Sequence, residues 1–420
     1  MVCAQSEIHE VTVSQAAEVL GVSVDTIRRW NKLGLIKARR SENNHRLFNL
    51  EELEKLQRKI SGFSSENHYR VLKAERRSKH TCIDLFAGAG GTALGFHNAG
   101  LNHIMLVEQD RDAVRTLTQN MPNWEVVQSD IRSVDFRGIR ADVVEAGFPC
   151  QAFSYAGHKR GFEDARGTLF YEFARAVRDI RPAIAVGENV RGLLAHDGGR
   201  TLNTMIRILR ELGYRVSYKL LRAQYHDVPQ KRERLIILAI REDLQVAALF
   251  PKENDYVVSL REALEGCPSS PGFEYTERKR RILELVPPGG YWKDLPDALQ
   301  REYMGRSYYL GGGKTGMARR LSWDEPSLTL TCNPAQKQTE RCHPEETRPL
   351  SVREYARIQT FPDEWQFSGS VASQYRQIGN AVPVNLGYHI GRCVVAMLEG
   401  RSEDDTMVAE PFFEPLQMLF

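Results

Sequence analysis

From His80 onward the sequence predicts an α/β fold with a doubly wound, Rossmann-like sheet. Short apolar runs of β type alternate with helical segments in this part of the chain, as strands and crossover helices do in such a sheet. Five of these runs end at residues that can do chemistry or bind a ligand: Phe86, Glu108, Asp130, Cys150 and Glu188. Because ligands in open α/β sheets bind beyond the carboxyl ends of the strands, the sequence predicts one crevice that holds a cofactor and a reacting group.

A separate helical module precedes this part of the chain. Residues 11–33 predict two short helices joined at Gly21, with Ser14 capping the first, and the stretch up to residue 50 fits a hairpin wing. The pattern resembles the winged-helix DNA-binding domain of MerR-type regulators. That resemblance places four residues against DNA, either in a groove or near phosphates: Thr26, Arg28, Arg29 and Arg46. A helical packing module with exposed charges is the alternative.

The first strand of the sheet leads into a glycine-rich loop, Asp84-Leu-Phe-Ala-Gly-Ala-Gly-Gly91. Glycines at such a strand-to-helix turn let the backbone approach a ligand closely. Glu108 follows Gly88 by twenty residues at the end of the next strand, a position suited to ribose hydroxyls. NAD enzymes and S-adenosylmethionine enzymes share this arrangement. Alanine at position 93 breaks the GxGxxG pattern and no nearby basic residue can hold a pyrophosphate, which favours S-adenosylmethionine.

The segment GFPCQAFS (147–154) resembles the nucleophile loop of DNA (cytosine-5) methyltransferases. Further motifs of that family follow one another along the chain: DLFAGAGGTALGF (84–96), RGTLF (166–170), GENV (187–190), QYHDVPQKRERLIIL (224–238), RPLSVREYARIQTFPDEWQF (348–367) and YRQIGNAVPVNLG (375–387). One departure is the strand Val143–Ala146, which Glu145 makes more polar than most versions. The resemblance implies sequence-specific methylation of carbon 5 of cytosine in double-stranded DNA, with S-adenosyl-L-methionine as cofactor.

The resemblance also assigns roles to the catalytic residues. A thiolate that adds to carbon 6 of cytosine turns carbon 5 into a nucleophile, and Cys150 would supply that thiolate after the target base has flipped out of the helix. Glu188 would hydrogen-bond or protonate ring nitrogen 3. Arg232 and Arg234, two apart at the start of a strand, would lie beside the base, with Arg234 also holding Glu188.

For the cofactor, the loop and the resemblance together give a set of ten residues: Phe86, Gly88, Ala89, Gly90, Gly91, Glu108, Asp130, Ile131, Leu169 and Asn380. Asp130 and Ile131 would hold the adenine, while Leu169 and Asn380 would line the methionine end. Gln151 and Ser154, in the loop of Cys150, would contact DNA.

These assignments divide the chain into a winged helix (1–62), a basic linker (63–79), a catalytic domain (80–240 and 346–400), a small target-recognition domain (241–345) and an acidic tail (401–420) that we expect to be frayed. Basic residues outnumber acidic ones before residue 80, which favours a polyanionic partner for that region.

Composition excludes several classes of protein. Hydrophobic residues make up 42% and charged residues 26% of the 420 residues, which is ordinary for a globular protein. No run reaches the roughly 20 apolar residues of a membrane span, and the N-terminus lacks an apolar signal core, so we expect a cytoplasmic protein that does not bind membranes. The seven cysteines include no CxxC pair, and we expect reduced thiols and no metal.

The expected partner is double-stranded DNA, with a cognate restriction endonuclease as a functional companion in a bacterial restriction-modification system; an orphan methylase would lack that companion. The N-terminal domain could regulate the enzyme's own promoter. Two other functions remain open: a transcription regulator with a vestigial methylase half, and a transfer-RNA cytosine-5 methyltransferase of the same fold.

Overall fold

The structure is a computed structural model. It describes residues 10–20, 24–32, 36–40, 46–50, 52–53, 67–149, 168–311 and 314–413, without the side chains of residues 25, 26, 29 and 32.

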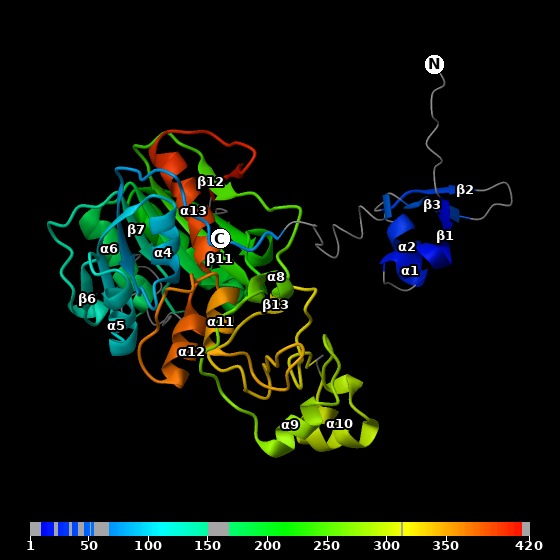
Figure 1. The fold of residues 1–420 in the computed structure, drawn as a ribbon. Helices are drawn as coiled ribbons and strands as arrows, with labels where there is room; N and C mark the ends of the chain where they lie inside the picture. Colours follow the sequence, from blue (N-terminus) through cyan, green and yellow to red (C-terminus); the bar gives the residue numbers. More distant parts are fainter. Residues whose placement is uncertain are drawn as a thin grey trace.

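A seven-stranded sheet forms the centre of the catalytic part, in the order β6-β5-β4-β7-β8-β11-β9 (Figure 1). The strands are β4 (Thr81–Leu85), β5 (Asn102–Glu108), β6 (Val126–Gln128), β7 (Val143–Ala146), β8 (Ile184–Val190), β9 (Tyr214–Arg222) and β11 (Glu233–Arg241). The strands from β6 to β8 pair in parallel, whereas β11 runs antiparallel to both of its neighbours. The predicted doubly wound α/β sheet is confirmed, with one reversed strand that the sequence pattern did not reveal.

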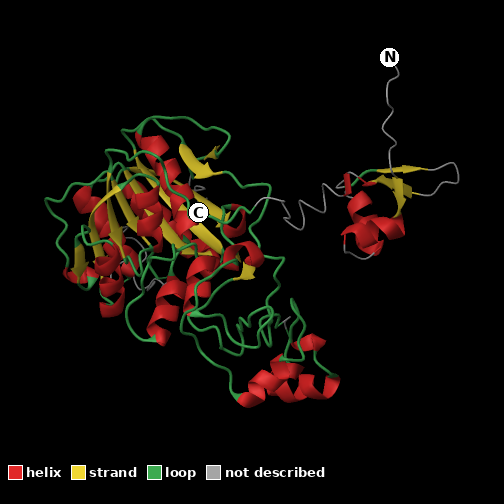
Figure 2. Cartoon of the chain, viewed as in Figure 1, coloured by secondary structure: helices red, strands yellow, loops and turns green. Residues whose placement is uncertain are grey.

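Helices cover both faces of this sheet (Figure 2). On one face, α6 (Leu169–Ile180) and α7 (Arg200–Glu211) pack on Ile83 and Leu85. On the other, α13 (Val384–Leu398) packs on Cys82 and contacts α4 (Gly91–Asn98). Because side chains alternate along a strand, Asp84 lies on the same face as Cys82. α5 (Arg111–Asn120) joins a third apolar cluster with α11 (Val352–Ile358) and α12 (Val371–Asn380).

Small residues allow α4 and α13 to approach closely. A Cβ atom added at Gly91 would collide with the carbonyl oxygen of Val382, and one added at Gly95 would lie 2.5 Å from the carbonyl oxygen of Val384. A Cβ at Gly391 would lie 2.7 Å from that of Ala99. Gly91 is therefore needed for the close packing of α4, in addition to any role in binding a ligand.

We expect Gly91→Ala to lower the free energy of unfolding by about 1–3 kcal/mol, because a backbone carbonyl cannot rotate away from the added methyl group. Gly311→Ala is the matched control, since nothing lies within 4 Å of a Cβ atom there. Urea unfolding followed by circular dichroism measures the difference. Equal stabilities of the two variants would contradict the close packing of α4.

Residues 371–398 form a helical stretch long and apolar enough, by composition, to cross a membrane. Its most apolar window is 72% buried inside the protein, and α13 packs against α4 and the sheet. It is therefore a core element. Polar residues such as Asn380 and Asn385 interrupt the apolar run, so this stretch does not stand out in the sequence.

The segment between β11 and α11 leaves the sheet and returns to it. Its elements are β12 (Ala248–Pro251), α8 (Leu260–Leu264), α9 (Glu277–Leu283), α10 (Asp297–Met304) and β13 (Ser327–Leu328), the last paired with β10 (Gln230–Lys231). α9 and α10 share a small apolar core of their own around Leu283, Trp292 and Met304. The two lie at one end of the molecule, away from the central sheet (Figure 1).

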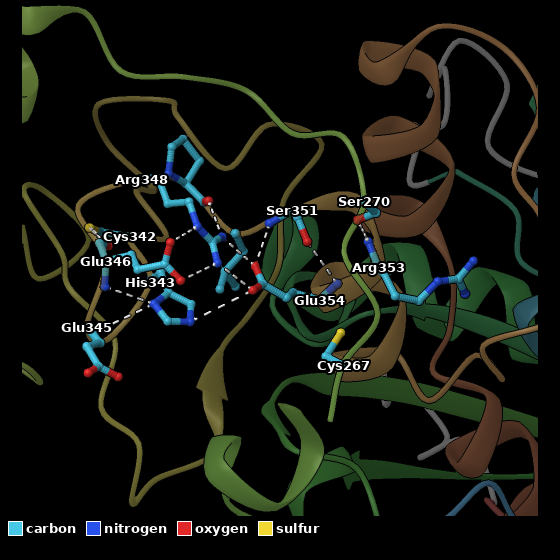
Figure 3. A network of polar contacts seen from close by, with 12 residues as sticks. Cys267, Ser270, Cys342, His343, Glu345, Glu346, Arg348, Ser351, Arg353 and Glu354 are labelled. Carbon is cyan, nitrogen blue, oxygen red and sulfur yellow. Dashed lines mark hydrogen bonds and ion pairs between the residues drawn. The ribbon is translucent and has the colours of Figure 1, made fainter. Parts of the chain in front are cut away.

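A polar network fixes the return of this segment to the catalytic core (Figure 3). The Arg348 guanidinium lies between the carboxylates of Glu346, at 3.0 Å, and Glu354, at 2.8 Å. The Ser351 side chain accepts from the Glu354 backbone N–H and caps α11, and the Ser351 backbone N–H donates to the Glu354 carboxylate in return. His343 Nδ1 accepts hydrogen bonds from the backbone N–H groups two and three residues later in the chain, at 3.3 and 3.0 Å. Among the described residues, no group of three or more His, Cys, Asp or Glu side chains is placed to hold a metal ion.

Two segments outside the sheet are more ordered than expected. The expectation of a frayed tail was wrong for residues 407–410, which form β14 (Met407–Glu410) and pair with β12. Residues 67–79, which we assigned to a linker, lie along the catalytic core: Tyr69 Oη donates to the carbonyl of Arg357 at 3.0 Å, and Leu72 N donates to Asn385 Oδ1 at 2.9 Å. Contacts with residues far along the chain order both segments.

The N-terminal module has its own small core. It comprises β1 (Glu10–Thr12), α1 (Val13–Leu20), α2 (Val24–Lys32), β2 (Ala38–Arg40) and β3 (Arg46–Asn49), with β3 between the other two strands. Its buried residues are Ala16, Ala17, Leu20, Ile27, Ile36, Phe48 and Leu53. The cap of α1 is Thr12, which exchanges hydrogen bonds with Gln15, and the prediction of Ser14 was wrong because the helix begins at Val13 and includes Ser14. The predicted hairpin wing is confirmed by the pairing of β2 with β3.

Candidate active site

A cavity of about 640 Å³ opens at the carboxyl ends of β4 to β8. Eleven of the predicted residues line it: Phe86, Gly88, Gly91, Glu108, Asp130, Ile131, Leu169, Glu188, Arg232, Arg234 and Asn380. Ala89 and Gly90 do not line it. Ala89 is buried in an apolar cluster, and Gly90 has a left-handed φ of 86° where a Cβ would lie 2.7 Å from Leu117 Cδ2. These two residues shape the loop from behind.

Glu108 holds the glycine loop in place. Its Oε2 accepts a hydrogen bond from the Gly88 backbone N–H at 2.7 Å, while Oε1 accepts from the N–H groups of Gln109 and Asp110 at 2.8 and 2.7 Å. A carboxylate has about four lone-pair sites, so Glu108 can still accept from a ligand. Phe86 adopts a positive φ of 64°, a conformation that is strained for a non-glycine residue and is concentrated at functional loops.

Asp130 and Ile131 form the far end of the cavity, beyond β6. Asp130 caps a short 3₁₀ turn and makes a two-pronged ion pair with Arg132, at 3.0 Å (Oδ1 to Nε) and 2.6 Å (Oδ2 to Nη2). The hydrogen bonds from Arg132 lower the pKa of the Asp130 carboxyl. Its carboxylate is therefore ionised and can only accept hydrogen bonds, while the buried Ile131 side chain offers an apolar surface beside it.

Glu188 and Arg234 form a buried ion pair at the opposite end. Glu188 Oε1 lies 2.6 Å from Arg234 Nε, and their side chains are 13% and 12% exposed. Burial raises the pKa of Glu188, and the charges of Arg234 and Arg232 oppose that rise. Such a carboxyl group can hold a proton more readily than a solvated one. β8 and β11 set this geometry, because Arg234 pairs in register with Val190, two residues after Glu188.

Arg232 is the more deeply buried of the two arginines. Its guanidinium donates to the carbonyls of Leu330 at 3.2 Å and Gly379 at 3.1 Å. Burial lowers the pKa of Arg232 to about 9, which still leaves the side chain cationic at neutral pH. These contacts join the strand bearing Arg232 to two distant segments that also border the cavity.

Cys150, Gln151 and Ser154 lie outside the described residues, but the start of their loop is defined. Asn189 Nδ2 donates to the Phe148 carbonyl at 2.9 Å. A Cβ atom at Gly147 would lie 3.3 Å from Glu188 Oε2. The loop that carries Cys150 therefore starts directly beside the Glu188 carboxyl group.

Of the four DNA contacts expected in the N-terminal module, Arg28 and Arg46 are exposed, on α2 and at the start of β3. The side chains of Thr26 and Arg29 are outside the described part of the chain. Arg39 of the wing pairs with Glu10 at 2.8 Å.

The cavity is also lined by residues that were not among the predicted site residues, including Asp84, Glu145, Asn189 and Arg376. Asn189 and Arg376 lie within the family motifs quoted above, but nothing in the sequence marks their side chains as site residues. The polar Glu145 in an otherwise apolar strand was a visible signal. Its partner, Asp84, could be identified only from the register of β4 and β7.

The seven-stranded sheet of this order, with one reversed strand, brings a glycine loop and a largely buried Glu–Arg pair to one cavity. Two solved structures share the fold. An E. coli prophage-encoded protein described as a DNA modification methyltransferase is 23% identical, with a TM-score of 0.56, and the match covers 76% of this chain and 100% of that one. Spodoptera frugiperda DNMT2 is 17% identical, with a TM-score of 0.54 and coverage of 76% and 100%.

The family of C-5 cytosine-specific DNA methylases matches residues 80–396, and the chain belongs to it. The chain is 53% identical to the Type II methyltransferase M.Eco47II of Escherichia coli, over 93% of this chain and 96% of that one. It is 48% identical to M.PspPI of Psychrobacter sp. (strain TA137), over 92% and 96%, and 49% identical to M.Sau96I of Staphylococcus aureus, over 78% of each. Residues 12–48 match the MerR family of regulatory proteins.

Proposed function

We propose that this DNA (cytosine-5) methyltransferase takes its methyl group from S-adenosylmethionine and acts on a flipped-out cytosine through a transient covalent bond to Cys150. The observation that carries the proposal is the buried Glu188–Arg234 pair. It shares one cavity with the glycine loop and lies against the start of the Cys150 loop. One cavity thus offers room for both the methyl donor and the target base.

The residues present fit S-adenosylmethionine, which supplies an electrophilic methyl group when bound. Gly88 and Gly91 keep the wall of the cavity free of side chains, and Glu108 has lone pairs left for ribose hydroxyls. The ionised Asp130 with the apolar Ile131 suits an adenine. Phe86 would stack near that adenine, and Leu169 and Asn380 would line the methionine end, while Ala89 and Gly90 hold the loop that places these contacts.

At the base, Cys150 Sγ would form a bond to carbon 6 as its thiol proton leaves. A free thiol with a pKa of about 8.5 is only a few per cent ionised at pH 7, so deprotonation must accompany engagement of the base. A proton from Glu188 on ring nitrogen 3 makes carbon 6 more electrophilic. Carbon 5 then takes the methyl group; loss of its proton and cleavage of the Sγ–C6 bond release the product.

The two arginines would act by position. Arg234 holds the Glu188 carboxyl group, and Arg232 would offer a fixed positive charge near the carbonyl oxygen of the base. Carbon 6 cannot be reached inside a duplex, so the base must flip out, at a cost of a few kcal/mol. Gln151 and Ser154, from the Cys150 loop, and the recognition segment 241–345 would bind the DNA and offset that cost.

Bisulfite sequencing of a plasmid from cells that express the full chain tests this function. We expect protected cytosines in a single short sequence context, and none in cells that carry an empty vector. Purified protein should transfer labelled methyl groups to duplex oligonucleotides of that sequence. Equal or faster transfer to RNA, or protection without sequence preference, would contradict the proposal.

We further propose that the N-terminal module binds DNA, adding affinity to the enzyme and regulating its own promoter. Two observations support this role: the winged helix-turn-helix architecture of residues 10–53 and the MerR match. The matches to M.Eco47II and M.PspPI extend over more than nine-tenths of the chain, so they include part of this module. At least part of the module is thus shared with these two relatives.

We expect deletion of residues 1–62 to raise the KM for DNA and to reduce the salt dependence of binding, because phosphate contacts are lost, while kcat changes less than about tenfold. The deletion must stop before residue 67, since the segment from there on packs on the catalytic core. Methylation rates and promoter-fragment binding, measured from low to high salt, provide the readout. An unchanged KM and salt dependence would contradict a DNA-binding role.

The relatives are bacterial Type II methyltransferases by name. We propose that the enzyme works in the cytoplasm beside a restriction endonuclease that cuts the same sequence. Survival of cells that express such an endonuclease only when this chain is present would establish the pairing.

A further inference from the structure

Two acidic side chains that the mechanism above does not use face each other beneath the cavity. Asp84 on β4 and Glu145 on β7 are register partners on adjacent parallel strands, and each is only 2% exposed. Hydrogen bonding with Glu145 lowers the pKa of the Asp84 carboxyl group, against the larger rise that burial causes. Among the described residues, none forms a hydrogen bond with Glu145 Oε1, and both acids line the cavity.

The strand order shows which part of the cavity they face. Asp130 follows β6, Glu108 ends β5, and Glu188 lies on β8, whereas the two acids lie on β4 and β7 between them. Under the proposed function, the nucleoside end of the donor lies over β6 and β5 and the target base lies by β8. The sulfur and its methyl group must then lie over the middle of the sheet, above Asp84 and Glu145.

Burial limits the charge that these acids can carry. Burial raises the pKa of both carboxyl groups, and each is raised further by nearby acids: Asp84 by Glu108, and Glu145 by Asp84 and Glu188. Two negative charges in contact in a buried place are strongly disfavoured. The pair therefore shares one proton and holds a single negative charge when a cation is close.

We propose that the Asp84–Glu145 pair supplies a single buried negative charge that selects the cationic sulfonium donor over its neutral thioether product. This inference rests on the proposed use of S-adenosylmethionine. Methyl transfer removes the positive charge from sulfur, so the attraction ends when the reaction is complete, and product release becomes easier. The ammonium group of the methionine part is common to donor and product, so a ratio of their affinities isolates the effect at sulfur.

Calorimetric titration of the full chain with S-adenosylmethionine and with S-adenosylhomocysteine tests the inference. D84N and E145Q each leave one carboxyl group, which the bound cation ionises, so we expect the ratio of the two dissociation constants to stay within about twofold of the wild-type ratio. D84N/E145Q removes the charge, and we expect the preference for the donor to fall about tenfold or more. A wild-type ratio in the double variant, or an equal loss in the single variants, would overturn the inference.

If the double variant does not bind the product or does not unfold cooperatively, the number of protons released on binding provides a second test. Other described titratable groups around the pair are Cys82 on β4, Glu108 on β5 and Glu188 on β8. Titrations between pH 5 and 9, in buffers of different ionisation heat, should show wild-type protein releasing more protons with the donor than with the product. Equal proton counts throughout for wild type would overturn the inference. Wild-type protein that binds neither nucleoside would instead refute the proposed cofactor.

Discussion

Cys150→Ala should abolish methyl transfer, with a loss of at least about 10⁴-fold in kcat, and leave S-adenosylmethionine binding within about twofold of wild type. Without the Sγ–C6 bond, carbon 5 of cytosine is not nucleophilic enough to accept a methyl group, so no weaker route replaces the missing step. The cofactor contacts come from other strand ends. Single-turnover assays with labelled donor and a duplex of the identified sequence measure the rate.

Cys267→Ala is the matched control for this substitution. Burial raises the pKa of the Cys267 thiol to about 11, and the residue does not line the cavity, so we expect full activity. A duplex with 5-fluorocytosine at the target position should join covalently to the wild-type protein and not to Cys150→Ala, because fluorine cannot leave as the C5 proton does. Turnover by Cys150→Ala, or an adduct at another residue, would refute the mechanism.

Glu188→Gln should lower kcat by about 10² to 10⁴-fold, the usual contribution of a positioned general acid. Glutamine can still donate a hydrogen bond to ring nitrogen 3 but cannot transfer a proton. Burial raises the pKa of Glu188, so its protonated form persists to higher pH than that of a solvated glutamate and is lost as the pH rises through the raised value. Wild-type kcat should therefore carry a high-pH decline that Glu188→Gln lacks.

Glu233→Gln serves as the control, since Glu233 pairs at the surface with Arg191, whose side chain is 66% exposed, and does not line the cavity. We expect its kcat to stay within about twofold of wild type. Thermal unfolding of Glu188→Gln should remain cooperative even though Arg234 loses a charged partner. A Glu188→Gln enzyme with wild-type kcat and pH profile would remove Glu188 from the chemistry.

The sequence predicted the parts of the fold that depend on local pattern. Alternating apolar runs and helices gave the sheet, and the chemical residues at successive strand ends, Phe86, Glu108, Asp130 and Glu188, do line one cavity. The prediction of one cavity succeeded because parallel strands place their carboxyl ends at the same edge of the sheet.

Features that depend on contacts between distant segments could not be predicted. The pairing of β12 with β14 joins residues far apart in sequence, and the reversal of β11 between β8 and β9 leaves no mark on its apolar pattern. The contact between Asp84 and Glu145 needs strand register, which hydrophobic pattern alone does not supply. Residues 67–79 look like a linker because polar contacts with the core, not apolar periodicity, hold them.

The crossing of α4 and α13 has a consequence for synthesis on the ribosome. All strands of the central sheet precede residue 242, yet the backbone at Val382 and Val384 that packs against Gly91 and Gly95 emerges much later. A nascent chain can pair its strands, but one sheet face lacks the cover of α13 until that helix leaves the exit tunnel. We therefore expect a chain that ends before α13 to be prone to aggregation.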